Sequence, residues 1–108
     1  MQFDEYQQEA MKNKVYGYGD KITYPTLGLV NEAGEVAGKV KKVLRDDNGV
    51  YTPESRLAIA KELGDSLWYI AATAEDIGYS LDTIAQLNIE KLTDRRNRGV
   101  IQGSGDNR

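Results

Sequence analysis

The apolar residues of this chain recur at helical spacing along most of its length. In residues 2–16, Phe3, Tyr6 and Ala10 share one face, which is typical of a short amphipathic helix, and the glycine-rich run at residues 17–20 ends it. Because apolar positions three or four residues apart lie on one side of a helix, we expect this face to pack against a neighbouring element.

Two longer helices are predicted next, and each begins with a threonine and a proline. The first starts at residues 23–25 and keeps one apolar stripe until the polar turn at residues 46–49. The second starts at residues 52–53 and continues to Ile77, where Gly78 favours a helix end. The pattern therefore predicts two long amphipathic helices.

Ser80 is the expected cap of a fourth helix, whose apolar stripe includes Ile84 and which ends near Gly99. The remaining residues, 99–108, are rich in glycine and polar side chains, and we expect them to form a flexible tail. No segment alternates apolar and polar residues as a strand does. The fold class is therefore all-α, in a single domain that spans residues 1–108.

The helix predicted over residues 53–77 is apolar on two sides. Its main stripe includes Leu63 and Ile70. A second row, with Trp68 beside it, consists of Ala58, Glu62, Asp65, Tyr69 and Ala72. A helix that is apolar on most of its circumference is normally covered on two sides, and four helices in so short a chain offer little to cover it. We therefore expect a four-helix bundle core completed by self-association. The alternative is a monomer in which Trp68 and Tyr69 are partly exposed.

The composition excludes several classes of chemistry. The 108 residues contain neither cysteine nor histidine, so disulfides, thiol nucleophiles, Ser-His-Asp relays and conventional zinc sites are excluded. A net charge of -3 argues against a surface that binds nucleic acid polymers. No apolar run approaches the roughly 18 residues of a membrane span and no signal peptide opens the chain, so we expect a protein of the cytoplasm, with no membrane partner.

Four acidic residues form two pairs at helical spacing, Glu32 with Glu35 and Glu62 with Asp65. Residues three apart lie on one helix face, so each pair points two carboxylates the same way. If the two helices pack antiparallel, all four carboxylates converge, and the repulsion between them requires a counterion. Oxygen donors without imidazole or thiolate favour Mg²⁺ or Mn²⁺ and argue against a di-iron centre. The alternative is a set of ordinary exposed charges, with Glu35 paired to Lys39.

The fourth predicted helix carries a second polar feature. Asn88 falls in the middle of the apolar stripe, where a buried amide needs a hydrogen-bond partner. Lys91 and Arg95 follow on the same side and, with Arg96 and Arg98, make this end of the helix basic. These residues predict an anion site. The alternative is that the cations complement the negative end of the helix dipole, which leaves Asn88 unexplained.

Together these features predict a phosphorylated ligand. Carboxylates loaded with metal beside a cationic strip would bind a polyphosphate. The aromatic rings available for stacking on a base are those of Tyr16, Tyr18, Tyr24, Trp68 and Tyr69. We therefore expect a nucleoside triphosphate as the ligand. The Gly-x-x-x-x-Gly-Lys-Ser/Thr loop is absent, so the chain is not a P-loop protein.

Three stretches of the sequence also match a known pattern. They are GLVNEAGEV at residues 28–36, KELGDSLWY at residues 61–69 and NIEKLTDR at residues 88–95. Their combination resembles the paired Glu-x-x-Glu and Glu-x-x-Asp motif of the MazG-like, all-α nucleoside triphosphate pyrophosphohydrolases. The resemblance covers residues 28–98, which is nearly the whole domain.

The resemblance implies Mg²⁺-dependent cleavage between the α and β phosphates of a nucleoside or deoxynucleoside triphosphate, which gives the monophosphate and pyrophosphate. One glutamate of the motif would also orient the attacking water. The family assembles as dimers or tetramers, so a homodimer or homotetramer is implied. The matching positions are Glu32, Glu35, Glu62 and Asp65 as metal ligands and Asn88, Lys91 and Arg95 as nucleotide contacts.

Two rival functions use the same residues. The first is a non-catalytic helical module that binds a nucleotide or a partner, although the presence of all four motif acids argues against it. The second keeps the chemistry and changes the substrate to an alarmone or a modified nucleotide.

Overall fold

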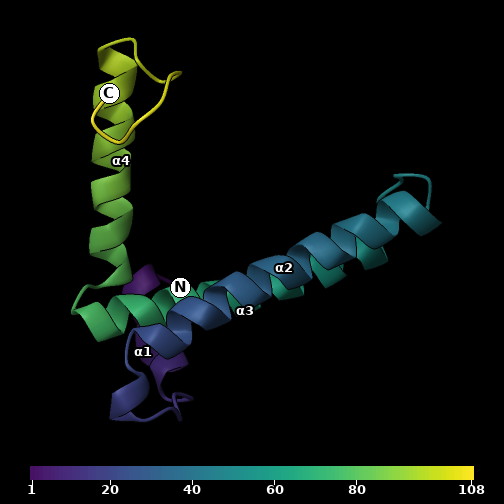
Figure 1. Ribbon diagram of the computed structural model, residues 1–108, viewed down its shortest axis with the longest axis horizontal. Coiled ribbons are helices and arrows are strands. Elements are labelled where there is room, and N and C mark those ends of the chain that lie inside the picture. The colour runs from purple at the N-terminus through teal and green to yellow at the C-terminus, as the bar shows by residue number, and fades with distance from the viewer.

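The computed structural model describes residues 1–108 and contains helices and no strands (Figure 1). The prediction of an all-α chain is therefore confirmed. None of the helices combines the length with the apolar character of a membrane-spanning segment. In chain order the elements are α1 (Phe3–Met11), the 3-10 turn η1 (Tyr18–Asp20), α2 (Thr23–Asp46), α3 (Pro53–Ile77) and α4 (Leu81–Asn97).

Local hydrogen bonds determine where α3 begins and ends and where α4 begins, as the sequence predicts. Thr52 Oγ1 accepts the backbone N–H of Ser55 at 3.1 Å, and Ser55 Oγ accepts the N–H of Thr52 at 2.8 Å, so the two residues cap α3 reciprocally. Gly78 ends α3 with a φ of 82°, a left-handed conformation that glycine adopts at little cost. Ser80 then caps α4 by accepting the N–H of Thr83 at 3.1 Å.

The first helix is shorter than the pattern predicts. α1 ends at Met11, whereas the apolar spacing predicts a helix over residues 2–16. Beyond Met11 the chain crosses the C-terminal part of α3, where the side chains of Lys14 and Tyr16 donate hydrogen bonds to Asp76. A tertiary contact about 60 residues away in sequence therefore holds this segment outside the helix.

The helices are arranged as a hairpin with two additions. α2 and α3 pack antiparallel, α1 lies against α3, and α4 contacts α1 and α3 and then projects away from the hairpin (Figure 1). Leu87 and Ile89 on α4 are 51% and 58% exposed, because no helix of the same chain covers them. The predicted four-helix bundle is therefore not closed within one chain. Its completion by self-association stays a prediction.

The two apolar sides of α3 have different surroundings. The row that contains Glu62, Asp65 and Tyr69 faces α2. On the main predicted stripe, Leu63 and Ile70 are 53% and 38% exposed. The row with the chemically useful residues is therefore the one that packs against α2, and the main stripe is partly open to solvent.

A small core lies where α1, α3 and α4 meet. Ala71, Ala74 and Leu81 are buried there. Gln7 of α1 is also buried, and its amide donates to the carbonyl of Tyr79 at 3.1 Å and accepts the N–H of Leu81 at 2.9 Å. These bonds satisfy backbone groups of the turn between α3 and α4. They fix α1 against that turn, so the segment after α1 runs beside α3.

Candidate active site

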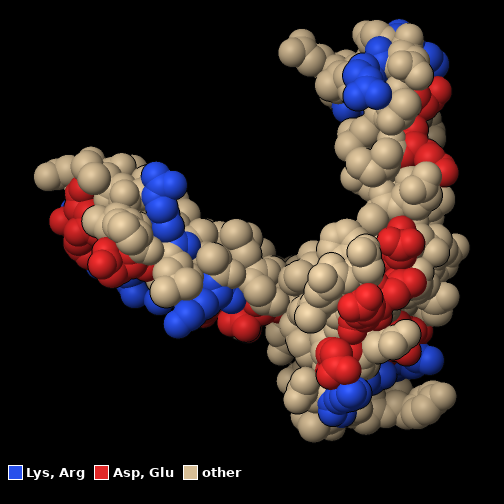
Figure 2. Space-filling view, turned by 180° about the vertical axis from the view of Figure 1, so that it is seen from behind, with Lys and Arg blue, Asp and Glu red and all other residues tan.

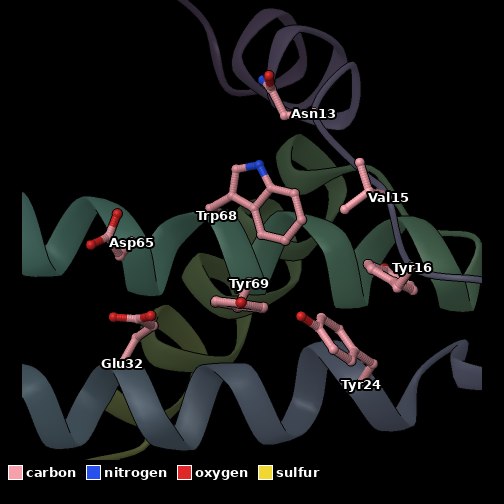
Figure 3. A pocket seen from close by; sticks show the side chains of 8 residues that line it. All are labelled: Asn13, Val15, Tyr16, Tyr24, Glu32, Asp65, Trp68 and Tyr69. Atoms are coloured by element: carbon pink, nitrogen blue, oxygen red, sulfur yellow. The ribbon is translucent and has the colours of Figure 1, made fainter.

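The antiparallel hairpin brings acidic residues of α2 and α3 together. Glu32 on α2 lies opposite Glu62 and Asp65 on α3, and one carboxylate oxygen from each lies within 4.8 Å of the other two. Figure 3 shows Glu32 and Asp65 pointing toward each other across the space between the helices. Glu35 is exposed and lies outside this group. The structure thus gathers three of the four predicted ligands, which we call the acidic cluster.

The acidic cluster has no internal counterion. No ion pair of the protein involves Glu32, Glu62 or Asp65. Burial raises the pKa of Glu32, and the negative charges of Asp65, Glu62 and Glu35 raise it further. A divalent cation would relieve this repulsion, and Mg²⁺ and Mn²⁺ prefer oxygen ligands of this kind. The residues present therefore fit such an ion.

A pocket of about 370 Å³ opens beside the acidic cluster. Its volume lies within the range of small-molecule sites, about 300–1,000 Å³. Figure 3 shows Glu32 and Asp65 at one end of the pocket, Tyr16 and Tyr24 at the other, and aromatic rings of α3 between them. The pocket is therefore acidic at one end and aromatic along the rest.

Trp68 and Tyr69, the two aromatic residues predicted to contact the ligand, both line this pocket. Their rings meet edge to face, with centroids 5.0 Å apart and planes at 83°. Trp68 Nε1 donates to the carbonyl of Ala10 at 3.0 Å, which ties the indole to the end of α1. Tyr69 lies against Gly28 of α2, where an added Cβ would overlap the phenol ring. Glycine at residue 28 therefore allows Tyr69 to lie between the helices.

Two lining residues, Asn13 and Val15, are absent from the predicted site, whereas Tyr16 and Tyr24 are among the aromatic rings that the sequence offers for stacking. Asn13 and Val15 belong to the segment after α1, whose path no local pattern reveals. Tyr16 and Tyr24 stack with centroids 5.0 Å apart and planes at 25°, and the Tyr24 ring centroid lies 6.4 Å from that of Tyr69. Tyr18, the other tyrosine that the sequence offers for stacking, is 90% exposed and does not line the pocket.

The predicted nucleotide contacts on α4 lie away from the acidic cluster. A helical rise of about 1.5 Å per residue puts Arg95 about 21 Å along α4 from Leu81, on a helix that projects from the hairpin (Figure 1). Figure 2 shows Lys and Arg side chains gathered at the free end of this helix. Asn88 borders a separate pocket with Lys91 and is exposed. The prediction that Asn88 is buried is wrong for the single chain: it also borders a pocket with Leu67 and Ile70 of α3, but it stays exposed.

Arg95 is buried, but by the C-terminal residues of its own chain. It is 6% exposed, and its Nη2 donates to the carbonyl of Asp106 at 2.7 Å. Arg108 in turn donates from Nε to the carbonyl of Val100 at 3.1 Å. Residues 99–108, for which the composition predicts a flexible tail, fold back over the end of α4 as a loop. In this arrangement Arg95 binds the loop and does not face the acidic cluster.

Two comparisons relate this chain to known proteins. Residues 23–100 match the model of the MazG nucleotide pyrophosphohydrolase domain. The chain is 50% identical to the Gene 37 protein of Mycobacterium phage L5, in an alignment that covers 100% of both chains. No solved structure shows significant similarity to it. Because the matched region includes α2 and α3 with the whole acidic cluster, the chain belongs to the MazG nucleotide pyrophosphohydrolase family.

Proposed function

We propose that the protein hydrolyses nucleoside or deoxynucleoside triphosphates between the α and β phosphates and releases the monophosphate and pyrophosphate. The observation that carries this proposal is the acidic cluster, whose three carboxylates lack an ion-pair partner at one end of an aromatic pocket. Membership of the MazG family supports the same class of reaction.

The acids have distinct roles in this proposal. Glu32, Glu62 and Asp65 hold Mg²⁺ or Mn²⁺ through their carboxylate oxygens. When bound, such an ion supplies positive charge to the polyphosphate and acidity to a water molecule. Glu35 lies about 60° round α2 from Glu32. Although it lies outside the acidic cluster, its carboxylate would serve as a fourth ligand of the ion or would orient the attacking water.

The aromatic part of the pocket receives the base. With the triphosphate at the acidic end, the nucleoside extends toward Trp68 and Tyr69, which lie next along the pocket (Figure 3). Stacking of a base on an aromatic side chain contributes about 1–3 kcal/mol and tolerates different bases. The rings therefore supply affinity, while groups at the far end of the pocket discriminate among bases.

The nucleotide contacts predicted on α4 would come from a second copy of the chain. Asn88 and Lys91 are exposed on the helix α4, which projects from the hairpin (Figure 1). Arg95 is covered by residues 99–108 of its own chain, so this loop would have to move before Arg95 contacts a nucleotide. In a homodimer or homotetramer, α4 of one copy lies against the hairpin of another. The exposed apolar side chains of Leu63 on α3 and Leu87 on α4 support such an assembly, since exposed apolar surface marks interaction sites.

Product analysis tests the proposed reaction. The purified protein is incubated with NTPs, dNTPs, alarmones and modified nucleotides, with Mg²⁺ or with EDTA, and the phosphate products are resolved. We expect monophosphate and pyrophosphate in the presence of Mg²⁺ and neither product in the presence of EDTA. Glu62→Gln should abolish turnover, whereas Glu75→Gln, which neutralises an exposed acid of α3 outside the cluster, should not.

Three other outcomes of these assays would change the proposed function. Full activity of Glu62→Gln would refute the role of the acidic cluster. Turnover restricted to alarmones or modified nucleotides would keep the chemistry and change the substrate. Metal-dependent nucleotide binding without turnover would identify a binding module instead of an enzyme.

A further inference from the structure

Asp76 is a buried carboxylate that the proposed chemistry does not use. It lies near the C-terminal end of α3, and its side chain is 0% exposed. Its oxygens accept three hydrogen bonds, from Lys14 Nζ at 2.7 Å, from Tyr16 Oη at 2.8 Å and from the backbone N–H of Ile22 at 2.9 Å. All three donors belong to the segment that joins α1 to α2. One side chain of α3 therefore holds that whole segment in place.

The backbone of this segment is strained where Asp76 binds it. Ile22 has φ 67° and ψ -54°, and the N–H of Thr23 donates to the carbonyl of Lys21 at 2.7 Å. This is a tight γ-turn of the rare kind, and a positive φ is costly for a β-branched residue. Such a conformation persists only when its surroundings hold it. The hydrogen bond from Ile22 to Asp76 is the contact that holds it, directly before α2 begins.

The same segment builds the end of the pocket opposite the acidic cluster. Tyr16 donates its hydroxyl proton to Asp76 and stacks on Tyr24 with ring centroids 5.0 Å apart. Both rings line the pocket, with Asn13 from the same segment. Figure 3 shows the Tyr16 and Tyr24 rings at the end away from Glu32 and Asp65. The position of this wall therefore depends on the bond between Tyr16 and Asp76.

The protonation states of Tyr16 and Asp76 are compatible with a hydrogen bond that holds this wall of the pocket. Burial, the hydrogen bond to Asp76 and its negative charge raise the pKa of Tyr16 well above its ordinary value. Burial would raise the pKa of Asp76, but the hydrogen bonds from Ile22, Lys14 and Tyr16 lower it. Near neutral pH the phenol is therefore protonated and the carboxylate ionised. Because its proton is already donated to Asp76, Tyr16 can offer a base only its ring and its oxygen lone pair.

We propose that Asp76 is a positioning residue that acts through Tyr16 to set the base-discriminating wall of the pocket. The proposal rests on the proposed function, since it assumes that the pocket takes a nucleoside triphosphate with its base at the aromatic end. Asp76 itself touches neither the triphosphate nor the acidic cluster. Its effect is therefore confined to contacts with the base.

Fluorescence of Trp68 provides a direct test. Trp68 is the only tryptophan of the chain and lines the pocket, so binding should change its emission. The full-length protein with Mg²⁺ is titrated with triphosphates that carry a methylene bridge between the α and β phosphorus atoms, one for each common base. Inorganic tripolyphosphate, which has no base, is titrated in parallel. None of these measurements requires turnover.

Two variants probe the contact, and two serve as matched controls. Tyr16→Phe removes the hydrogen bond to Asp76 but keeps the ring and the other bonds of Asp76, so it remains informative if Asp76→Asn fails to fold. Tyr18→Phe changes a tyrosine that is 90% exposed on the same segment, and Glu75→Gln removes the charge next to Asp76. The fold of each protein is checked by its thermal unfolding midpoint.

We expect Tyr16→Phe to raise the Kd for nucleotides by about two- to tenfold, the range for one lost hydrogen bond. The differences in Kd among the bases should shrink, and the Kd for tripolyphosphate should stay the same. In turnover assays the same variant should raise KM and leave kcat unchanged. Asp76→Asn should act in the same direction, and both controls should match the wild type.

Unchanged nucleotide Kd values in folded Tyr16→Phe and Asp76→Asn would overturn the proposal. An equal loss of affinity for nucleotides and tripolyphosphate would also overturn it, because a merely structural role weakens both. Absence of cleavage by a wild-type protein that binds these nucleotides would refute the proposed enzyme and leave the binding test of Asp76 in force. A wild type that binds no nucleotide would overturn both.

Discussion

Gly28→Ala tests whether the close approach of Tyr69 to α2 shapes the pocket. Within a helix this change ordinarily stabilises a protein by about 1 kcal/mol, because glycine is a poor helix former. At residue 28 the added methyl group would overlap the Tyr69 ring, so the ring or the helix must move. Gly38, also on α2, has no heavy atom within 4 Å of the position that a Cβ would occupy. Gly38→Ala is therefore the matched control.

The expected difference in stability between Gly28→Ala and Gly38→Ala follows from overpacking and helix propensity. Overpacking of this kind costs about 1–3 kcal/mol, against the gain of about 1 kcal/mol from helix propensity. Gly28→Ala should therefore lie between neutral and about 2 kcal/mol destabilising, whereas Gly38→Ala should stabilise by about 1 kcal/mol. Once Tyr69→Ala has removed the ring, Gly28→Ala should behave like Gly38→Ala. The displaced Tyr69 ring should also weaken nucleotide binding in Gly28→Ala alone.

Urea unfolding followed by circular dichroism measures these free energies in a double-mutant cycle. The set comprises the wild type, both glycine variants, Tyr69→Ala and the Gly28→Ala/Tyr69→Ala double variant. The double variant should be more stable than the sum of the two single effects predicts, since residues 28 and 69 are in contact. Equal stabilisation by the two glycine variants, or a cost of Gly28→Ala that persists without the Tyr69 ring, would show that the ring does not limit the side chain at residue 28.

Two further predictions concern charge. Because hydrogen bonds hold the pKa of Asp76 below its ordinary value of 3.8 in the fold, the unfolded chain takes up a proton first, and the free energy of unfolding should fall as pH drops below 3.8. Asp76→Asn should flatten this part of a plot of unfolding midpoint against pH, and an unchanged plot would contradict the assignment. Mn²⁺ at 100 times its Kd should stabilise the wild type by about 2.7 kcal/mol and raise its thermal midpoint. Glu62→Gln, which removes one ligand of the acidic cluster, should gain much less, and an equal gain would place the ion elsewhere.

The limits of the helices show what local sequence can determine. Thr52 and Ser55 cap α3 through groups three residues apart, and Gly78 ends it through its own backbone freedom. These interactions are complete within one turn of the chain, so the sequence pattern predicts them. The end of α1 depends instead on the bonds of Lys14 and Tyr16 to Asp76, which no nearby residue indicates.

The acidic cluster could be predicted only in part from the local sequence. The three-residue spacing and the apolar stripes predict that α2 and α3 each present two acids, and antiparallel packing then brings Glu32 to Glu62 and Asp65. The rotation of each helix about its axis is set by packing, for example by the Tyr69 ring against Gly28. That rotation leaves Glu35 outside the cluster, which spacing alone could not show.

The helical fold class, the ends of α3, the start of α4 and the MazG motif can be read from the amino-acid pattern, because each follows from spacing or from contacts within a few residues. The path of the segment after α1, the stacking of Tyr16 on Tyr24, the position of Glu35 outside the acidic cluster and the cover over Arg95 are visible only in the fold. These features depend on contacts between residues far apart in the chain. Their energies come from packing and from buried hydrogen bonds such as those of Asp76, which a one-dimensional pattern does not record.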